Sequence, residues 1–204
     1  MDKPNTLRPD LALIADQINA GERMLDVGCD DGALLHWLIH NKKVDGRGIE
    51  LNQAGVNLCV AKGLFVIQGD AEKDLSDYPD DSFDVVVLSK TLQATNRPRE
   101  VLHALLRVGK RAIVSIPNFG YWKVRYKLLA TGKMPVTRSL HSTWYDTSNI
   151  HFCTILDLVE LIEAEGLKLR KFIPNDSFGK PLRCGLQSAN WRANQALFVI
   201  EKKL

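Results

Sequence analysis

The chain contains 204 residues, 45% of them hydrophobic, which suits one buried core and is too short for two, so we expect a single domain over residues 1–204. Its 27 basic and 24 acidic residues leave a formal net charge of +3, an excess too small to indicate a nucleic-acid partner or a membrane surface. The 4 cysteines form no C-x-x-C pair, and we recognise neither a targeting leader nor an apolar run of roughly 18 residues, so we expect a cytoplasmic protein without disulfides, metal site or membrane span.

The first half of the chain alternates short apolar segments with segments of helical spacing. Helices are expected over residues 9–20, 33–41 and 52–62. Strands are expected at residues 25–27, 44–50, 64–68 and 83–88, with a polar connection over residues 74–82. Strands that are apolar throughout and alternate with helices are typical of a parallel sheet covered on both faces.

The second half continues this alternation. A helix over residues 98–108 starts with a proline, which suits the first turn, and ends at Gly109. The later elements expected are a strand, an amphipathic basic helix, a further helix and two final strands, at residues 111–116, 119–141, 154–165, 168–173 and 196–201. The sequence therefore predicts an α/β fold with a doubly wound, mostly parallel sheet of about seven strands and an antiparallel C-terminal hairpin.

A tight glycine turn follows the first strand and leads into a helix. Asp26 lies near the end of the strand, and Gly28 and Gly32 follow it, which allows backbone angles and close contacts that a Cβ forbids. The first N–H groups of the next helix have no partner within the helix, so such a loop favours a carboxylate, a hydroxyl or a phosphate. The sequence predicts a nucleotide-like ligand at this turn.

Acidic residues also end the next two strands. Glu50 and Leu51 follow the second apolar segment, and Asp70 and Ala71 follow the third. A D-x-G-x-x-x-G turn followed by these strand ends resembles the motifs of class I S-adenosylmethionine (SAM) methyltransferases. The resemblance implies that Glu50 holds the ribose of SAM or S-adenosylhomocysteine (SAH) and that Asp70 and Ala71 meet its adenine. It implies ten cofactor-binding residues and assigns no catalytic one: Asp26, Gly28, Cys29, Asp30, Gly32, Glu50, Leu51, Asp70, Ala71 and Ser89.

One position departs from this family pattern, because Asp30 stands where such turns usually carry a glycine. Asp tolerates left-handed backbone angles better than most residues, so the turn is still compatible with it. Its carboxylate would repel the carboxylate of SAM, by roughly 1 kcal/mol in partly wet surroundings, or attract the ammonium or sulfonium group. We expect weaker SAM binding than in an Asp30→Gly variant.

Motifs in the middle of the chain are more specific than the glycine turn. They are N-F-G-Y-W-K-V-R, G-K-M-P-V-T and W-Y-D-T-S-N-I-H, with S-K-T-L-Q-A-T before them, at residues 118–125, 132–137, 144–151 and 89–95. Together they resemble the MetW family of methionine-biosynthesis proteins over nearly the whole chain. The resemblance implies a SAM-binding, methyltransferase-like protein that assists or regulates a homoserine O-acyltransferase, with residues 118–151 as an inserted basic and aromatic segment. The alternative is a SAM-dependent methyltransferase of an unidentified small metabolite.

Several residues have both a structural and a functional interpretation. Asp70 follows a glycine as in an ordinary turn, and Cys29 has no base beside it in the sequence, so we expect an unreactive thiol. Trp144, Tyr145 and His151 are expected to pack rather than to line a substrate pocket. An acceptor that needs a base would find only a few candidates near the ligand, namely His151, Asp30, Asp31 and Asp146.

Two segments keep alternative interpretations. The basic and aromatic residues 119–138 form a solvated helix face, a substrate lid or a docking surface. The long loop over residues 174–194 is a lid, a partner surface or a mobile segment.

Overall fold

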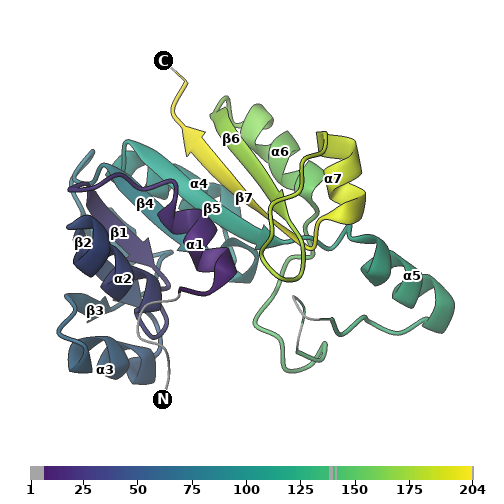
Figure 1. Ribbon diagram of the computed structural model, residues 1–204, viewed down its shortest axis with the longest axis horizontal. Coiled ribbons are helices and arrows are strands. Elements are labelled where there is room, and N and C mark those ends of the chain that lie inside the picture. The colour runs from purple at the N-terminus through teal and green to yellow at the C-terminus, as the bar shows by residue number, and fades with distance from the viewer. Residues whose placement is uncertain (1–6, 138–139, 141, 204) are drawn as a thin grey trace.

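The computed structural model describes residues 7–137, 140 and 142–203. One sheet runs through it in the strand order β3-β2-β1-β4-β5-β7-β6 (Figure 1). Its strands are β1 (Arg23–Val27), β2 (Asp45–Glu50), β3 (Val66–Gln68), β4 (Val85–Ser89), β5 (Arg111–Pro117), β6 (Lys168–Asn175) and β7 (Gln195–Glu201). Strands β1 to β5 pair in parallel, and β7 is antiparallel to β5 and β6. The predicted doubly wound, mostly parallel sheet with an antiparallel C-terminal hairpin is thus confirmed.

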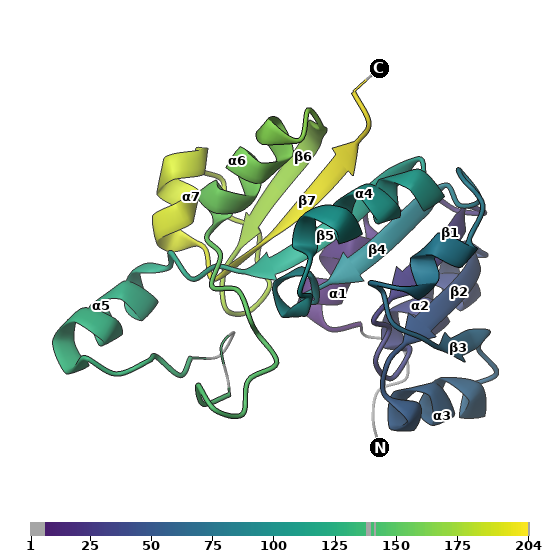
Figure 2. The ribbon, with the colours of Figure 1, turned by 180° about the vertical axis from the view of Figure 1, so that it is seen from behind.

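Helices cover both faces of the sheet, as expected for buried parallel strands. In Figure 1 α1 and α2 lie in front of the sheet, and Figure 2 brings α4 and α6 to the front. The helices are α1 (Pro9–Ala15), α2 (Ala33–Lys42), α3 (Gln53–Ala61), α4 (Pro98–Val108), α5 (Trp122–Thr131), α6 (Ile155–Ala164) and α7 (Leu186–Arg192), with 3₁₀ turns η1 (Asp74–Asp77) and η2 (Leu92–Ala94). Among these described helices, none has the length and apolar character needed to cross a membrane.

The alternation of side chains along β1 decides which way Asp26 faces. Leu25 and Val27 belong to the cluster that packs under α4 and α6, whereas Met24 belongs to the cluster under α1 and α2. Successive side chains of a strand point to opposite faces. Asp26 therefore lies on the side of the sheet that α1 and α2 cover.

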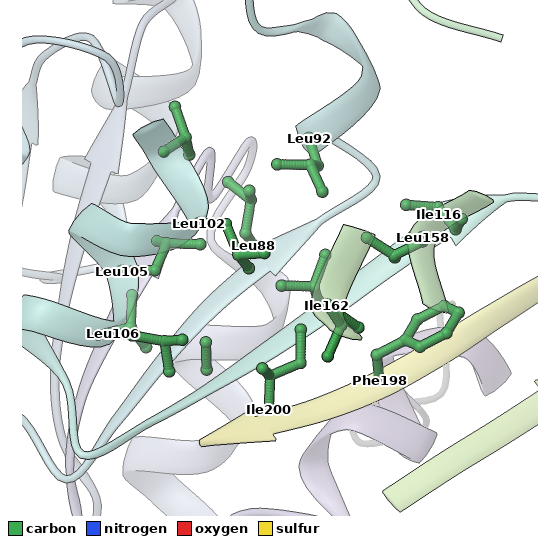
Figure 3. Close-up of a cluster of buried hydrophobic side chains, with 14 of the residues drawn as sticks. Leu88, Leu92, Leu102, Leu105, Leu106, Ile116, Leu158, Ile162, Phe198 and Ile200 are labelled. Carbon is green, nitrogen blue, oxygen red and sulfur yellow. The ribbon is translucent and has the colours of Figure 1, made fainter. Parts of the chain in front are cut away.

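The larger cluster fills the space between the sheet and the helices behind it. Figure 3 shows the leucines of α4 and Ile162 of α6 packed over Phe198 and Ile200 of β7. These side chains are almost completely buried, and burying each of them stabilises the fold by about 2 kcal/mol relative to exposure. This packing makes the sheet a rigid support for the loops at its edge.

Helix α1 is shorter than predicted, because it ends at Ala15 and not at residue 20. The Lys42 ammonium, at the end of α2, donates hydrogen bonds to the carbonyl oxygens of Ala15 and Ile18, at 2.8 and 2.7 Å. Carbonyls near a helix end lack partners within the helix. A cation from a segment distant in sequence satisfies them, and the sequence pattern of residues 9–20 carries no sign of it.

The predicted basic helix over residues 119–141 is also too long. Helix α5 ends at Thr131, because Gly132 adopts a left-handed conformation with φ of 64°, a common helix terminator. Residues 138, 139 and 141 of that prediction lie outside the described residues. In the loop predicted over residues 174–194, the structure has instead an extension of β6 to Asn175 and the short helix α7.

Candidate functional site

The strand ends that carry the predicted site residues lie side by side. Strand β1 pairs with β2 and β4, and β2 pairs with β3, all in parallel. Gly69, just after β3, donates a backbone hydrogen bond to the Glu50 carbonyl at 3.0 Å. The residues that follow β1, β2, β3 and β4 therefore share the carboxyl edge of the sheet, where ligands of such folds bind.

The turn after β1 requires glycine at two positions. Gly28 and Gly32 have φ of 73° and 71°, in the left-handed region. A Cβ at Gly28 would lie 2.9 Å from Thr91 Oγ1, and one at Gly32 would lie 2.5 Å from Leu64 Cδ1. Larger residues would be strained by both the backbone angle and the contacts. Between the two glycines Asp30 adopts φ of 52°, so the turn survives the substitution as expected.

Glu50 fastens this turn to the end of β2. Its Oε2 accepts a hydrogen bond from the Asp30 N–H at 2.8 Å, and its Oε1 accepts one from the Asn52 N–H at 2.9 Å. Each carboxylate oxygen has a second lone pair. Glu50 thus orients the loop and can still accept hydrogen bonds from ligand hydroxyls.

A cavity of about 180 Å³ opens between the glycine turn, the end of β4 and helix α1. Five predicted site residues line it: Asp26, Gly28, Cys29, Asp30 and Ser89. Asp31, expected as a candidate base near the ligand, also lines it, and five further lining residues were missed from the sequence: Arg8, Leu11, Ala33, Leu34 and Lys90. Lys90 lies two positions after the strand predicted at residues 83–88, which is a usable signal, whereas nothing in the local pattern of α1 indicates a ligand.

A larger cavity, of about 940 Å³, lies at the opposite edge of the sheet. Lys110, Lys168 and Leu169, at the starts of β5 and β6, line it. Ligands of parallel α/β sheets bind at the carboxyl ends of the strands. The smaller cavity at the glycine turn is therefore the candidate site.

Asp26 is the most unusual group of this site. It is 3% exposed, and no residue in the described part of the chain donates a hydrogen bond to its carboxylate. Burial, with the negative charge of Glu50 second, raises the pKa of Asp26 to about 7. Burying a carboxylate without a donor costs free energy, so the side chain is suited to a cationic ligand group.

Two cationic side chains, Lys90 and Arg8, line the same cavity. Lys90, the first residue after β4, places its Nζ 2.5 Å from Asp10 Oδ2 of helix α1. Arg8 Nε lies 3.5 Å from Asp10 Oδ1. Burial alone would raise the pKa of Asp10, but the hydrogen bond and charge of Lys90, followed by Arg8, hold it below its usual value. The cavity thus combines carboxylates with two cationic side chains.

The remaining predicted residues lie beside the cavity rather than in its lining. Gly32 and Glu50 shape the turn, and Leu51, which follows β2, is 67% exposed. Asp70 Oδ1 accepts a hydrogen bond from the Glu72 N–H at 2.9 Å, and its Oδ2 lies 3.2 Å from Lys73 Nζ. The Glu72 hydrogen bond is the main reason why the pKa of Asp70 is lowered. Its carboxylate is therefore part of a turn, while Ala71 packs against the core.

The side chain of Cys29 is held away from solvent. Its Sγ lies 3.9 Å from Cys59 Sγ. Burial, followed by the nearby charge of Asp26, raises the pKa of the Cys29 thiol. A thiol that remains protonated is a poor nucleophile, which agrees with the expected unreactive side chain.

Two of the aromatic residues that we expected to pack are instead exposed. Trp144 and Tyr145 are 70% and 68% exposed, and their rings contact each other edge to face, with centroids 5.6 Å apart. The His151 N–H donates a hydrogen bond to the Gln93 carbonyl at 2.9 Å. Within the residues that the structure describes, no three His, Cys, Asp or Glu side chains cluster as metal ligands would.

A family model described as "Methionine biosynthesis protein MetW" matches residues 8–200. A bifunctional methionine biosynthesis protein MetXA/MetW of Rhodopirellula baltica is 34% identical over 166 residues, which are 77% of this chain and 27% of that protein. A phthiotriol/phenolphthiotriol dimycocerosates methyltransferase of Mycobacterium tuberculosis is 32% identical over 114 residues, 52% of this chain and 42% of that protein. The chain thus spans less than half the length of these curated relatives.

Solved structures share the fold at low sequence identity. SAM-dependent methyltransferases of Mesorhizobium loti and Thermotoga maritima superpose with TM-scores of 0.69 and 0.66 at 17% identity, over 95% of this chain and 98% and 88% of theirs. The [4+2]-cyclase SpnF superposes with a TM-score of 0.65 at 17% identity, over 95% of this chain and 80% of its own. Such likenesses establish a fold and not a reaction. With the family model matching nearly all of its length, the chain belongs to the MetW family and has the fold of SAM-dependent methyltransferases.

Proposed function

We propose that this chain binds SAM or SAH in the cavity beside the glycine turn and that the bound ligand regulates a homoserine O-acyltransferase. Asp26 is the observation that carries the ligand part of the proposal. Its carboxylate is buried, lines the cavity and accepts no hydrogen bond from any described residue. The ammonium group of a SAM-like ligand would supply the missing donors and the missing charge.

The ligand orientation that puts its ammonium group at Asp26 also fits the other predicted residues. Gly28 lines the cavity without a side chain of its own, and Glu50 retains lone pairs for the ribose hydroxyls. The exposed Leu51 side chain next to Glu50 is available to cover a flat ring. We assign the adenine of the ligand to Leu51, Asp70 and Ala71. The amino-acid end of the ligand is assigned to six residues: Asp26, Gly28, Cys29, Asp30, Gly32 and Ser89.

The partner part of the proposal is supported by the relative from Rhodopirellula baltica. That protein is named MetXA/MetW, and this chain matches only 27% of its length. A relative that carries a MetW part and a MetXA part in one polypeptide keeps the two together. We infer that this chain associates with a homoserine O-acyltransferase, in the cytoplasm, and needs neither nucleic acid nor membrane.

The inserted segment is the surface that we propose for this association. We predict that residues 118–151 are an insertion into a single domain spanning residues 1–204. Helix α5 within it extends away from the sheet in both views (Figures 1 and 2). A ligand can change the association only through different affinities for the free and the associated forms. SAM or SAH would therefore have to bind one of these forms more tightly than the other.

Two measurements test the proposal. Calorimetric titration of the purified chain with SAM and with SAH should give saturable binding, and the Asp26→Ala variant should lose most of it. Co-purification with the homoserine O-acyltransferase, followed by acyl-transfer assays with and without this chain and SAM, should show a change in rate. Absence of binding heat would remove the ligand part, and unchanged acylation in every mixture would remove the regulatory part.

The second candidate is a methyltransferase acting on a small metabolite. It is favoured by the carboxylates of Asp30 and Asp31 in the cavity, which are placed to accept a proton from an acceptor. When bound, SAM supplies a methyl group that is already activated, so the protein would mainly have to align the acceptor. Formation of SAH from labelled SAM with a panel of metabolites would support this candidate, whereas no turnover with any of them favours the regulator.

A further inference from the structure

Lys90 has a backbone conformation that its own side chain does not favour. Its φ is 56°, in the left-handed region that residues with a Cβ adopt at a cost of about 1 kcal/mol. Its N–H donates to the Ser115 carbonyl at 2.9 Å and lies 3.1 Å from Ser115 Oγ. Its carbonyl accepts a hydrogen bond from Gln93 Nε2 at 2.5 Å. Surrounding residues thus hold Lys90 in a strained conformation, which is a common property of functional positions.

The start of α1 is held close to this lysine. The Lys90 ammonium and the Asp10 carboxylate form an ion pair across 80 positions of sequence, with side chains 38% and 17% exposed. The backbone of Asp10 also lies close to the loop after β6. A Cβ at Gly179 in that loop would lie 2.9 Å from the Asp10 nitrogen. Asp10 is therefore held near Lys90 and neutralises the charge of its ammonium group.

The charges of the cavity match the amino-acid end of a ligand. Asp26 offers an unpartnered carboxylate for an ammonium group, and Lys90 and Arg8 line the same cavity with positive charge. A free α-amino-acid group carries one ammonium and one carboxylate. The ligand carboxylate needs a cation, and Lys90 lies at a fixed backbone position where Asp10 is the one described residue that forms an ion pair with it.

We propose that Lys90 binds the carboxylate of the ligand's α-amino-acid end and that this carboxylate replaces Asp10 as its partner. This inference rests on the proposed binding of SAM or SAH. Asp10 then acts as a competitor within the protein, and the measured affinity is lower than the affinity of the freed lysine. Removal of Lys90 and removal of Asp10 must therefore change the affinity in opposite directions.

The test compares two ligands by calorimetry. SAH contains the amino-acid end, and 5′-methylthioadenosine lacks it. Lys90→Gly removes the ammonium group, and glycine suits the left-handed backbone conformation. Lys90→Gln is a second variant that removes the same charge. Both should bind SAH about tenfold more weakly than the unaltered protein does, the usual loss for a charged hydrogen bond. Asp10→Asn should bind SAH about threefold more tightly, the upper part of the range for a half-exposed ion pair.

None of these variants should change the affinity for 5′-methylthioadenosine. Lys110→Gln, which breaks an ion pair with Asp84 away from the cavity, is the matched control and should leave both affinities unchanged. Equal SAH affinity of Lys90→Gly and the unaltered protein would overturn the inference and leave the proposed function standing. An equal loss for both ligands, or weaker SAH binding by Asp10→Asn, would overturn it as well. If the unaltered protein binds neither ligand, the proposed function is wrong, and the inference that rests on it is wrong with it.

Discussion

At the scale of single residues, every second residue of the turn after β1 has a left-handed backbone conformation, namely Gly28, Asp30 and Gly32. Only Asp30 among them carries a side chain. Its backbone N–H is held by Glu50, while its exposed carboxylate lines the cavity together with those of Asp26 and Asp31. Asp31 is paired with Lys62 at 3.2 Å, whereas Asp30 forms no ion pair with any described residue, so its charge repels the carboxylate of a ligand. Asp30, which departs from the family pattern, therefore affects the binding of charged ligand groups more than it affects the conformation of the turn.

Asp30→Gly should bind SAM more tightly by about 1 kcal/mol, roughly fivefold in affinity, because one repulsive charge is removed. Its free energy of unfolding should change little, since relief of the left-handed strain is offset by the greater freedom of glycine in the unfolded chain. Calorimetric titration measures the affinity. Asp81→Gly is the control, because Asp81 also has a positive φ, 51°, but lines the opposite cavity. Equal SAM affinities of the Asp30 variant and the unaltered protein would contradict the prediction.

Asp26 should make the stability of the protein depend on pH. Its pKa of about 7 lies above the ordinary carboxyl value of 3.8, so burial of the charge costs no stability below about pH 4 and has its full cost above about pH 7. Asp26→Asn removes this cost. The free energy of unfolding of the variant relative to the unaltered protein should therefore rise by a few kcal/mol between about pH 4 and pH 7. Urea denaturation at both ends of this range measures it, and a difference that does not vary with pH would disprove the assignment.

At the scale of elements, Asn118 joins the carboxyl end of β5 to two helices. It is completely buried. Its Nδ2 donates hydrogen bonds to the carbonyls of Asn190 and Ala193, at 2.9 and 2.8 Å. Its Oδ1 accepts hydrogen bonds from the N–H groups of Gly120 and Ile155, at 2.9 and 3.3 Å. One amide thus connects the end of α7, the start of α6 and the turn that precedes α5.

Asn118→Ala should lower the free energy of unfolding by about 3 kcal/mol, because it leaves several buried backbone groups without partners. Urea denaturation gives the value. Asn57→Ala, at an exposed position of α3, should change the stability by less than about 0.5 kcal/mol. If both variants lose the same small amount, water replaces the amide and Asn118 does not hold these elements together.

At the scale of the whole molecule, α5 and its flanks differ from the rest of the surface. Residues 118–145 contain no Asp or Glu, although the complete chain has 24. Large apolar side chains of α5 are exposed, with Leu129 at 88%. At the base of the helix, Arg125 donates to the Gly120 carbonyl at 2.6 Å and lies 5.3 Å from the Trp191 ring centre. This ordered, cationic and apolar projection suits an acidic partner surface.

The double variant Lys123→Glu, Lys133→Glu should therefore weaken the proposed association with a homoserine O-acyltransferase by about tenfold or more, since it places like charges opposite the acidic surface proposed for the partner. SAM affinity should stay unchanged, because neither lysine lines the cavity. The control is Lys168→Glu, Lys203→Glu, which changes the net charge equally at the opposite cavity. Surface plasmon resonance with the immobilised acyltransferase compares them. Equal weakening by both pairs would show a general effect of net charge and not a docking surface.

Several features of this protein follow from its sequence alone. The apolar strands, their alternation with helices and the glycine turn at Gly28 and Gly32 depend on local periodicity and backbone sterics, which the sequence displays directly. The order of the acidic strand ends was sufficient to place Asp26, Glu50 and Asp70 at one edge, since parallel strands bring their carboxyl ends together.

Only the tertiary structure decided what surrounds those residues. The early end of α1 depends on Lys42, and the charge balance of the cavity depends on Lys90 meeting Asp10, 80 positions away. The high pKa of Asp26 arises because α1 and α2 cover that face of the sheet and none of the described residues there donates a hydrogen bond to its carboxylate. Such pairings and burials arise from packing between distant segments, and no periodic pattern in the sequence records them.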